Sequence, residues 1–300
     1  MTTAADFCQL FRIEASGGVE YSYDSVGSRH GVMISGSSAM LDRVGQFASG
    51  LPYAGDWAWA MRRFSGNVRP DAFLLRIDCS GERVAGLTLY CRFPTVLTDE
   101  SFDLALSTAR PFQWLGPAPS ILATTLGVPG PRGVGFRVSE DGEHKTALYF
   151  KLGGNSRSLG SEPLAQLATH CGLPEELAQT IREDIQGLYP QGPIGVVGFD
   201  SSDTSGKTTL KFDPANVPLR QTFNFLRGKG TDEQRISELT DTADSLRAMW
   251  VSYLGVKYNA QGFVGWRVYF SVKPGRVPAP DAPSISVGRG ESPTIPLPHY

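Results

Sequence analysis

The sequence has few cysteines, no long hydrophobic run and no motif for a metal. Its four cysteines are scattered over 300 residues without C-x-x-C spacing, which excludes a dense disulfide scaffold and offers no metal site. No apolar run approaches the ~18 residues that a membrane-spanning helix needs. The first residues lack a basic segment followed by an apolar core. We therefore expect a cytoplasmic protein with reduced thiols that makes no contact with a membrane.

The sequence also lacks an excess of positive charge. Lysine and arginine total 28 against 30 aspartates and glutamates, which gives a net charge of −2. Proteins that bind nucleic acid usually carry a strong basic excess, so we expect no nucleic-acid partner and look for local basic sites only. With 41% hydrophobic and 19% charged residues, the composition is that of an ordinary globular protein.

What the sequence does have is a repeated pair of strands. Stretches of alternating residues are joined by short turns that contain glycine, and the turns recur at a spacing of roughly 60 residues, which is typical of a repeat architecture. The strand pairs occupy residues 19–35, 72–93, 132–152, 193–213 and 252–272. Their turns lie at Gly27, Ser80–Gly81, Asp141–Gly142, Ser205–Gly206 and Asn259–Gly262. The first pair is the weakest of the five.

Helix-forming segments fill the gaps between the strand pairs. They cover about residues 37–64, 99–110, 161–188 and 219–249, with loops inside the longer ones. We assign the acidic group around Asp99 to a helix N-terminus, where carboxylates are favoured. Asp200 and Asp203 are placed in a hairpin loop. The predicted plan is an αββ unit, repeated.

This plan predicts an α+β fold with a closed barrel. Short hairpins make neighbouring strands antiparallel, which excludes a barrel of parallel strands with helical crossovers. Ten such strands lose their exposed edges if the sheet closes, and helices can then cover its outside. We predict a ten-stranded antiparallel β-barrel built from αββ repeats inside an outer ring of helices. Residues 1–273 form this single domain, and the Pro-rich residues 274–300 form a tail.

Each strand separates an apolar face from a face rich in cations and tyrosines. Residues two apart share a face, and Phe73, Leu75 and Ile77 lie opposite Arg76 and Asp78. Asp78 is the acid that we place near a strand centre. The polar face collects Arg76, Arg92, Arg137, Lys151, Lys211, Lys257 and Arg267, together with Tyr90, Tyr149, Tyr253 and Tyr269.

Two interpretations of this polar face are open for any one strand. A single strand is explained most simply by an open sheet with one face in water, but five hairpins with the same composition favour a closed interior. Cations gathered there would repel one another unless an anion lies among them. A diphosphate suits guanidinium and ammonium groups. Tyrosine rings attract cations by roughly 0.5–2 kcal/mol each, so together they predict a site for an allylic diphosphate and the carbocation that it leaves.

The pattern resembles the soluble aromatic prenyltransferases of the ABBA type, also called PT barrels, over nearly the whole chain. Local stretches are most similar to the small bacterial members that modify cyanobactin peptides. GSRHGVMIS resembles the strand in which an arginine binds diphosphate, and this implies the same role for Arg29. The strand before it, VEYSYD, places Glu20 where the family has an acid that serves as base, although a carboxylate facing solvent is the other interpretation. Three more stretches resemble strands of the family. The resemblance lies at Tyr90 and Arg92 in LTLYCRF, at Lys257 in MWVSYLGVKY, and at Arg267 and Tyr269 in WRVYFSV.

The resemblance implies an enzyme that transfers a dimethylallyl or geranyl group from an allylic diphosphate to an electron-rich aromatic ring. The acceptor would be an indole, a phenol, or a Trp or Tyr side chain of a peptide. In this reaction Glu20 would be the catalytic base. Arg29 and the seven cations above would bind the diphosphate, and the four tyrosines would shield the carbocation. The chain is expected to be a monomer, and the resemblance leaves Mg²⁺ dependence open. The alternative is a non-catalytic barrel that binds a small anionic or aromatic ligand.

Overall fold

A computed structural model describes residues 19–25, 29–36, 40–68, 70–152, 161–188, 194–203 and 208–272. The strands are β1 Val19–Asp24, β2 Arg29–Gly36, β3 Ala72–Ser80, β4 Arg83–Arg92, β5 Gly133–Ser139, β6 His144–Lys151, β7 Ile194–Ser202, β8 Thr208–Pro218, β9 Trp250–Asn259 and β10 Gly262–Val272. The helices are α2 Met40–Ser49, α3 Gly55–Val68, α4 Asp99–Thr108, α5 Pro119–Leu126, α6 Ser161–His170, α7 Glu175–Leu188, α8 Leu219–Gly228 and α9 Glu233–Leu246.

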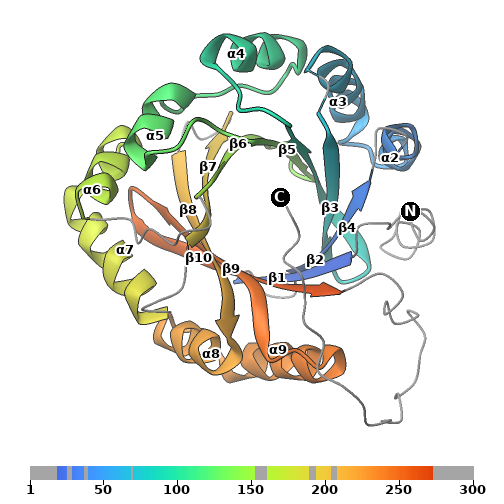
Figure 1. Ribbon diagram of the computed structural model, residues 1–300. Helices are drawn as coiled ribbons and strands as arrows, with labels where there is room; N and C mark the ends of the chain where they lie inside the picture. Colours follow the sequence, from blue (N-terminus) through green and yellow to red (C-terminus); the bar gives the residue numbers. More distant parts are fainter. Residues whose placement is uncertain are drawn as a thin grey trace.

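The ten strands form one closed antiparallel barrel, which confirms the predicted fold. Each strand pairs with its neighbours in sequence, and β1 pairs with β10 to close the ring. Figure 1 shows the helices as an outer ring around this barrel. The hairpin turns lie at one end of the barrel, while the connections to the helices leave from the other end. We call this second end the helix-connection end.

The hydrophobic core lies between the barrel and the helix ring. The apolar face of the strands points outward into it, as the alternation predicts, and Phe73, Leu75 and Ile77 are almost fully buried there. Phe136 of β5 shows how the layers join: its ring centroid lies 4.6 Å from that of Phe64 in α3. The barrel is therefore held from outside by apolar packing, which leaves its inward face for polar groups.

Among the described residues, each connection between strand pairs carries two helices. The predicted stretches 37–64, 161–188 and 219–249, with loops inside them, correspond to α2 and α3, α6 and α7, and α8 and α9, which agrees with the αββ plan. The prediction missed α5, a short helix with Pro119 at its first position and Gly127 at its C-cap with φ of 65°. Both residues are helix boundary signals, but the helix that they bound is only eight residues long.

The remaining expectations about the chain fall partly outside the described residues. Gly27, Ser205–Gly206 and the expected tail 274–300 are not among them, and the single-domain expectation stays a prediction. Within the described ranges, no helix combines the length and apolarity that crossing a membrane requires. The acidic group at Asp99 does lie at a helix N-terminus, where Thr98 caps α4.

We predict that Phe136→Ala lowers the free energy of unfolding by about 3–5 kcal/mol, because it leaves a cavity where the barrel meets α3. Phe136 is fully buried, and the centroid of its ring also lies 5.1 Å from the ring centroid of Phe112. Urea denaturation measures the change. Leu104→Ala is the control, since Leu104 is 61% exposed and its truncation should cost no more than about 0.5 kcal/mol. Similar values for the two variants would contradict this account of the core.

Candidate active site in the barrel lumen

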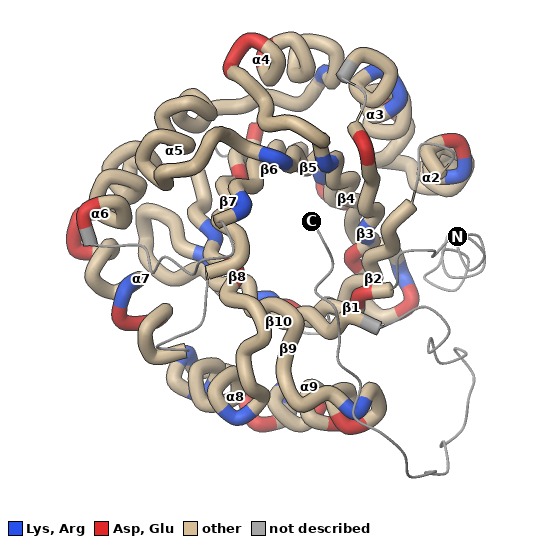
Figure 2. The backbone as a smooth tube through the Cα atoms, viewed as in Figure 1, with Lys and Arg blue, Asp and Glu red and all other residues tan. Residues whose placement is uncertain are grey.

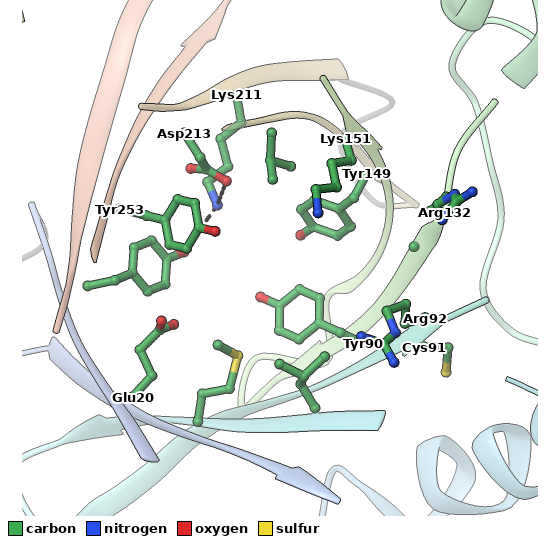
Figure 3. Close-up of a pocket in the computed structure, with 15 residues that line it drawn as sticks. Glu20, Tyr90, Cys91, Arg92, Arg132, Tyr149, Lys151, Lys211, Asp213 and Tyr253 are labelled. Carbon is green, nitrogen blue, oxygen red and sulfur yellow. Dashed lines mark hydrogen bonds and ion pairs between the residues drawn. The ribbon is translucent and has the colours of Figure 1, made fainter. Parts of the chain in front are cut away.

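One cavity opens inside the barrel towards the helix-connection end. All four predicted tyrosines line it, together with Glu20, Arg92, Lys151 and Lys211. The sequence analysis did not select its other polar residues, Arg132 and Asp213, or the apolar Met33, Leu74 and Val196. Figure 3 shows Glu20, Tyr90, Tyr149, Lys151, Lys211, Asp213 and Tyr253 around a shared space, while the side chains of Arg132 and Cys91 point away from it.

Two of the tyrosines pack against each other on one wall. The rings of Tyr90 and Tyr149 meet edge to face, with centroids 5.4 Å apart. Glycine makes room for them, because a Cβ at Gly135 would lie 3.1 Å from the Tyr90 ring and 3.2 Å from the Tyr149 ring. Gly198 of β7 is equally close to Tyr149. The aromatic wall thus depends on glycines at inward positions of the neighbouring strands.

Lys211 is a buried cation beneath this aromatic group. Its ammonium lies 3.0 Å from a carboxylate oxygen of Asp213 and donates a hydrogen bond of 3.1 Å to the Tyr269 hydroxyl. It also lies 5.2 Å and 5.9 Å from the ring centroids of Tyr269 and Tyr149. Burial alone would lower the pKa of Lys211, but Asp213 and nearby tyrosines raise it above its ordinary value. Lys211 is therefore protonated.

Glu20 lies on the wall of the cavity in β1. It is buried, and the Ser271 hydroxyl donates a hydrogen bond of 2.8 Å to its carboxylate. Burial raises the pKa of Glu20 to about 7, although the hydrogen bond from Ser271 opposes the shift. A carboxyl group with this pKa can take up and release a proton near neutral pH, which is what a general base requires.

Deeper in the lumen, Asp78 of β3 binds three arginines. Arg76, Arg137 and Arg267 reach its carboxylate at 3.1 Å, 3.4 Å and 3.0 Å. Arg267 also bonds Asp24 at 3.0 Å, so β1, β3, β5 and β10 are joined across the interior. Burial alone would raise the pKa of Asp78, but these arginines hold it well below its usual range.

Arg76 connects this cluster to the cavity above it. Its guanidinium donates hydrogen bonds to the hydroxyl groups of Tyr90 and Thr88. It also lies 5.4 Å from the centroid of the Tyr90 ring. Asp78 itself has room because β2 carries Gly31 beside it, where a Cβ would lie 3.2 Å from its carboxylate. The tyrosine wall and the arginine cluster therefore form one network.

The other predicted cations lie at different heights in the barrel. Lys257 is near Asp200 at 3.9 Å, and burial lowers the pKa of Lys257 to about 7. Arg92 pairs with Asp71 where β4 ends, at 3.1 Å and 3.2 Å, and Lys151 ends β6. Arg29 begins β2, opposite Ser80, but its side chain lies outside what the structure describes.

The prediction that Asp200 lies in a loop is wrong. It belongs to β7 and pairs with Ala147 and Thr209 in the adjacent strands. Asp78 is also not the single acid in the lumen, since Asp24 and Asp213 share the inward face. The sequence carried a signal for Asp213, which lies two residues after Lys211 and so on the same side of the strand. Figure 2 shows lysines, arginines and acids on the barrel strands as well as on the helices.

The described residues offer no cluster of three or more His, Cys, Asp or Glu side chains that could hold a metal ion. The carboxylate of Asp78, which is central in the lumen, is taken up by guanidinium groups rather than left open. These donors do not fit a protein-held Mg²⁺, and we assign no residue to one.

Comparisons with known proteins find likeness in structure alone. No family model and no curated protein sequence matches the chain. Among solved structures, the 5-dimethylallyltryptophan synthase of Streptomyces coelicolor in complex with DMASPP and Trp aligns with a TM-score of 0.56 at 15% identity, over 88% of this chain and 83% of that one. The chain folds as a PT barrel.

Two further structures support the same fold. The 6-dimethylallyltryptophan synthase of Micromonospora olivasterospora, also in complex with DMASPP and Trp, gives a TM-score of 0.55 at 12% identity, covering 85% of this chain and 82% of that one. AnaPT from Neosartorya fischeri gives 0.53 at 10% identity, covering 84% and 77%. At these identities the likeness establishes the fold, and the activity must be argued from the site.

We predict that Asp78→Asn lowers the free energy of unfolding by about 3–5 kcal/mol, because it leaves buried arginines without their counter-charge. The matched control is Asp71→Asn, which breaks a partly exposed pair with Arg92 and should cost about 0–1 kcal/mol. Denaturation in guanidinium chloride would obscure ionic effects, so urea is the denaturant of choice. Equal losses for both aspartates would show that the arginine cluster does not hold the barrel.

Proposed function

We propose that the chain is an aromatic prenyltransferase. It would transfer a dimethylallyl group from an allylic diphosphate to an electron-rich aromatic ring. The observation that carries the proposal is the cavity itself, which is lined by four tyrosines, a protonated lysine and a buried glutamate. Aromatic faces, fixed cations and a tunable base are the three elements that ionisation of an allylic diphosphate and capture of its cation need.

The first step is departure of the diphosphate. The bond between the allylic carbon and the diphosphate oxygen breaks, and both electrons leave with the oxygen. Cations placed in advance stabilise this negative charge as it develops. The sequence predicts this task for Arg29, Arg76, Arg92, Arg137, Lys151, Lys211, Lys257 and Arg267. Because Arg76, Arg137 and Arg267 are bound to Asp78, we assign it to the cations of this set that line the cavity, which are Arg92, Lys151 and Lys211.

The second step is capture of the allylic cation. Tyr90, Tyr149, Tyr253 and Tyr269 line the cavity and would present their electron-rich rings to the positive charge, which slows its reaction with water. The acceptor ring attacks the allylic carbon, and a new bond forms. Glu20 then accepts the proton that the ring loses, which restores aromaticity.

Two comparisons suggest which acceptors to test. The aligned synthases carry Trp in their complexes, which favours an indole as the first compound to test. The resemblance of single strands to cyanobactin-modifying members favours a Trp or Tyr side chain in a peptide. A geranyl donor belongs in the same panel, because the length of the prenyl group depends on the shape of the cavity.

A non-catalytic barrel is the second candidate, and one observation favours it. The aspartates of the lumen neutralise much of its positive charge, since Asp78 alone binds three arginines. A barrel that only binds a neutral aromatic ligand would need no excess of positive charge in its lumen. Release of diphosphate separates the two candidates, because a carrier binds its ligand without consuming it.

The assay incubates the protein with dimethylallyl or geranyl diphosphate and a panel of indoles, phenols and cyclic peptides that contain Trp or Tyr. A mass increase of one prenyl group on an acceptor, with matching release of diphosphate, is the expected result. Absence of both products across the panel, from protein shown to be folded, would favour the carrier.

We predict that Glu20→Gln lowers kcat by about 10²–10⁴-fold, the range for loss of a general base. Because burial raises the pKa of Glu20 to about 7, its carboxylate form is lost as the pH falls below that value. The wild-type rate should therefore drop about tenfold per pH unit on the acid side, and Glu20→Gln should lack this limb.

Glu82→Gln is the matched control for this experiment. Glu82 is exposed in the turn between β3 and β4, far from the cavity, so its variant should keep the wild-type rate and pH profile. An unchanged acid limb in Glu20→Gln would assign the titration to another group and remove Glu20 from the mechanism.

A further inference from the structure

Asp213 lines the cavity with one carboxylate oxygen that has no hydrogen-bond donor. Its Oδ2 lies 3.0 Å from the Lys211 ammonium, whereas none of the described residues donates to its Oδ1, which is buried. The residue as a whole is 6% exposed. A buried acceptor that lacks a donor costs free energy, so this carboxylate favours a ligand that brings a donor to it.

The carboxylate of Asp213 is held in position from two sides. Lys211 binds one oxygen, and Gly255 leaves room for the other, because a Cβ at Gly255 would lie only 2.8 Å from Oδ1. Asp213 belongs to β8 and Gly255 to the adjacent β9, so the barrel wall fixes both. A ligand group that meets this carboxylate meets a preorganised acceptor, which lowers the entropic cost of binding.

One lysine does not fully neutralise Asp213. Lys211 shares its ammonium with the Tyr269 hydroxyl, to which it donates a hydrogen bond of 3.1 Å. Burial raises the pKa of Asp213, although Lys211 opposes the shift. Asp78, in the same lumen, binds three guanidinium groups, so one carboxylate in this barrel can hold more than one cation. Asp213 thus has the capacity for a second cation beside Lys211.

The proposed base lies close to this carboxylate. Figure 3 shows Glu20, Tyr253 and Asp213 on one side of the cavity. The pKa of Tyr253 is raised by burial and then by the charges of Glu20 and Asp213, so its hydroxyl lies near both carboxylates. An aromatic ring that is anchored at Asp213 through a short side chain would therefore lie beside Glu20, which takes its proton.

We propose that Asp213 binds an ammonium group of the acceptor, so that the enzyme selects indoles or phenols that carry a positively charged side chain. This inference deepens the prenyltransferase function proposed above and rests on it for the identity of the ligand as the acceptor. The ammonium donates to the carboxylate, which then lies between two cations. A carboxylate on the ligand would be repelled at the same place. Asp213 sets specificity, and Glu20 keeps the role of base.

Three indoles of nearly the same shape test this selectivity without turnover. Tryptamine carries an ammonium group, 3-propylindole carries a methyl group in its place, and indole-3-propionate carries a carboxylate. Isothermal calorimetry of the full chain should show that tryptamine binds about tenfold more tightly than 3-propylindole, as expected for a hydrogen bond to a charged group. Indole-3-propionate should bind most weakly of the three. Equal affinity of the wild type for tryptamine and 3-propylindole overturns the proposal.

Asp213→Asn keeps the shape of the side chain and removes its charge. Tryptamine should then bind about tenfold more weakly, whereas the affinity for 3-propylindole should change by no more than about twofold. The matched control is Asp184→Asn, because Asp184 also pairs with a lysine, Lys229, at 2.6 Å, but lies on α7 outside the barrel. This control should keep the full preference for tryptamine. An unchanged preference in folded Asp213→Asn contradicts the assignment.

Glu20→Gln distinguishes the two carboxylates, and its result does not depend on whether Asp213→Asn folds. It should keep the preference for tryptamine, because the proposed contact is with Asp213. Loss of the preference in Glu20→Gln would place the ammonium at Glu20 and overturn the proposal.

The outcomes also separate this proposal from the proposed function. If the preference for tryptamine depends on Asp213 while the acceptor panel yields no prenylated product, the ammonium site stands and the transferase fails. If the panel yields product and the wild type binds tryptamine and 3-propylindole equally, the transferase stands and the ammonium site fails.

Discussion

The ion cluster around Asp78 is the interaction on which the interior of this barrel depends. Three arginines from β3, β5 and β10 meet one carboxylate, and Arg267 extends the cluster to Asp24 in β1. Without a counter-charge these guanidinium groups would repel one another in a space shielded from water. Asp78 makes it possible to fill a barrel with cations before any ligand arrives.

A closed barrel gives this cluster its setting. Closure leaves no edge strand, and the apolar face of every strand is covered by the helix ring, so the polar face has only the lumen. Glycines then decide how the lumen is filled. Gly31 makes room for Asp78, and Gly135 and Gly198 make room for the rings of Tyr90 and Tyr149. The cavity is thus the part of the lumen above the Asp78 cluster, whose charges are paired. The rings of Tyr90 and Tyr149 line one side of it, and the carboxylates of Glu20 and Asp213 line another.

The sequence was sufficient to predict the barrel because its signals are local. Alternation assigns each side chain to a face, and short glycine turns make neighbouring strands antiparallel. The same parity brought Tyr253 and Tyr269 to the cavity. The partners of the cations could not be predicted in this way. Which strands lie across the lumen from each other depends on closure, so the contact of Arg267 with Asp78, 189 residues away, has no local signature.

Two site residues were missed for more specific reasons. Asp200 is followed by Ser201, Ser202 and Asp203, a composition typical of a turn, whereas β7 continues to Ser202. Arg132 opens the predicted strand pair 132–152, and alternation places it on the same face as Val134 and Phe136, so it was not selected with the inward cations. Asp213 could have been found, because it shares a face with Lys211. Looking for acids at the same parity as each cation would have predicted a lumen that is largely neutral.

A structure of the protein with DMASPP bound would test the central claim most directly, because it shows where the donor places its charge. The account predicts the diphosphate beside Arg92, Lys151 and Lys211, the prenyl chain against Tyr90 and Tyr149, and Asp78 still bound to its arginines. A diphosphate seated among Arg76, Arg137 and Arg267, with Asp78 displaced, would contradict it.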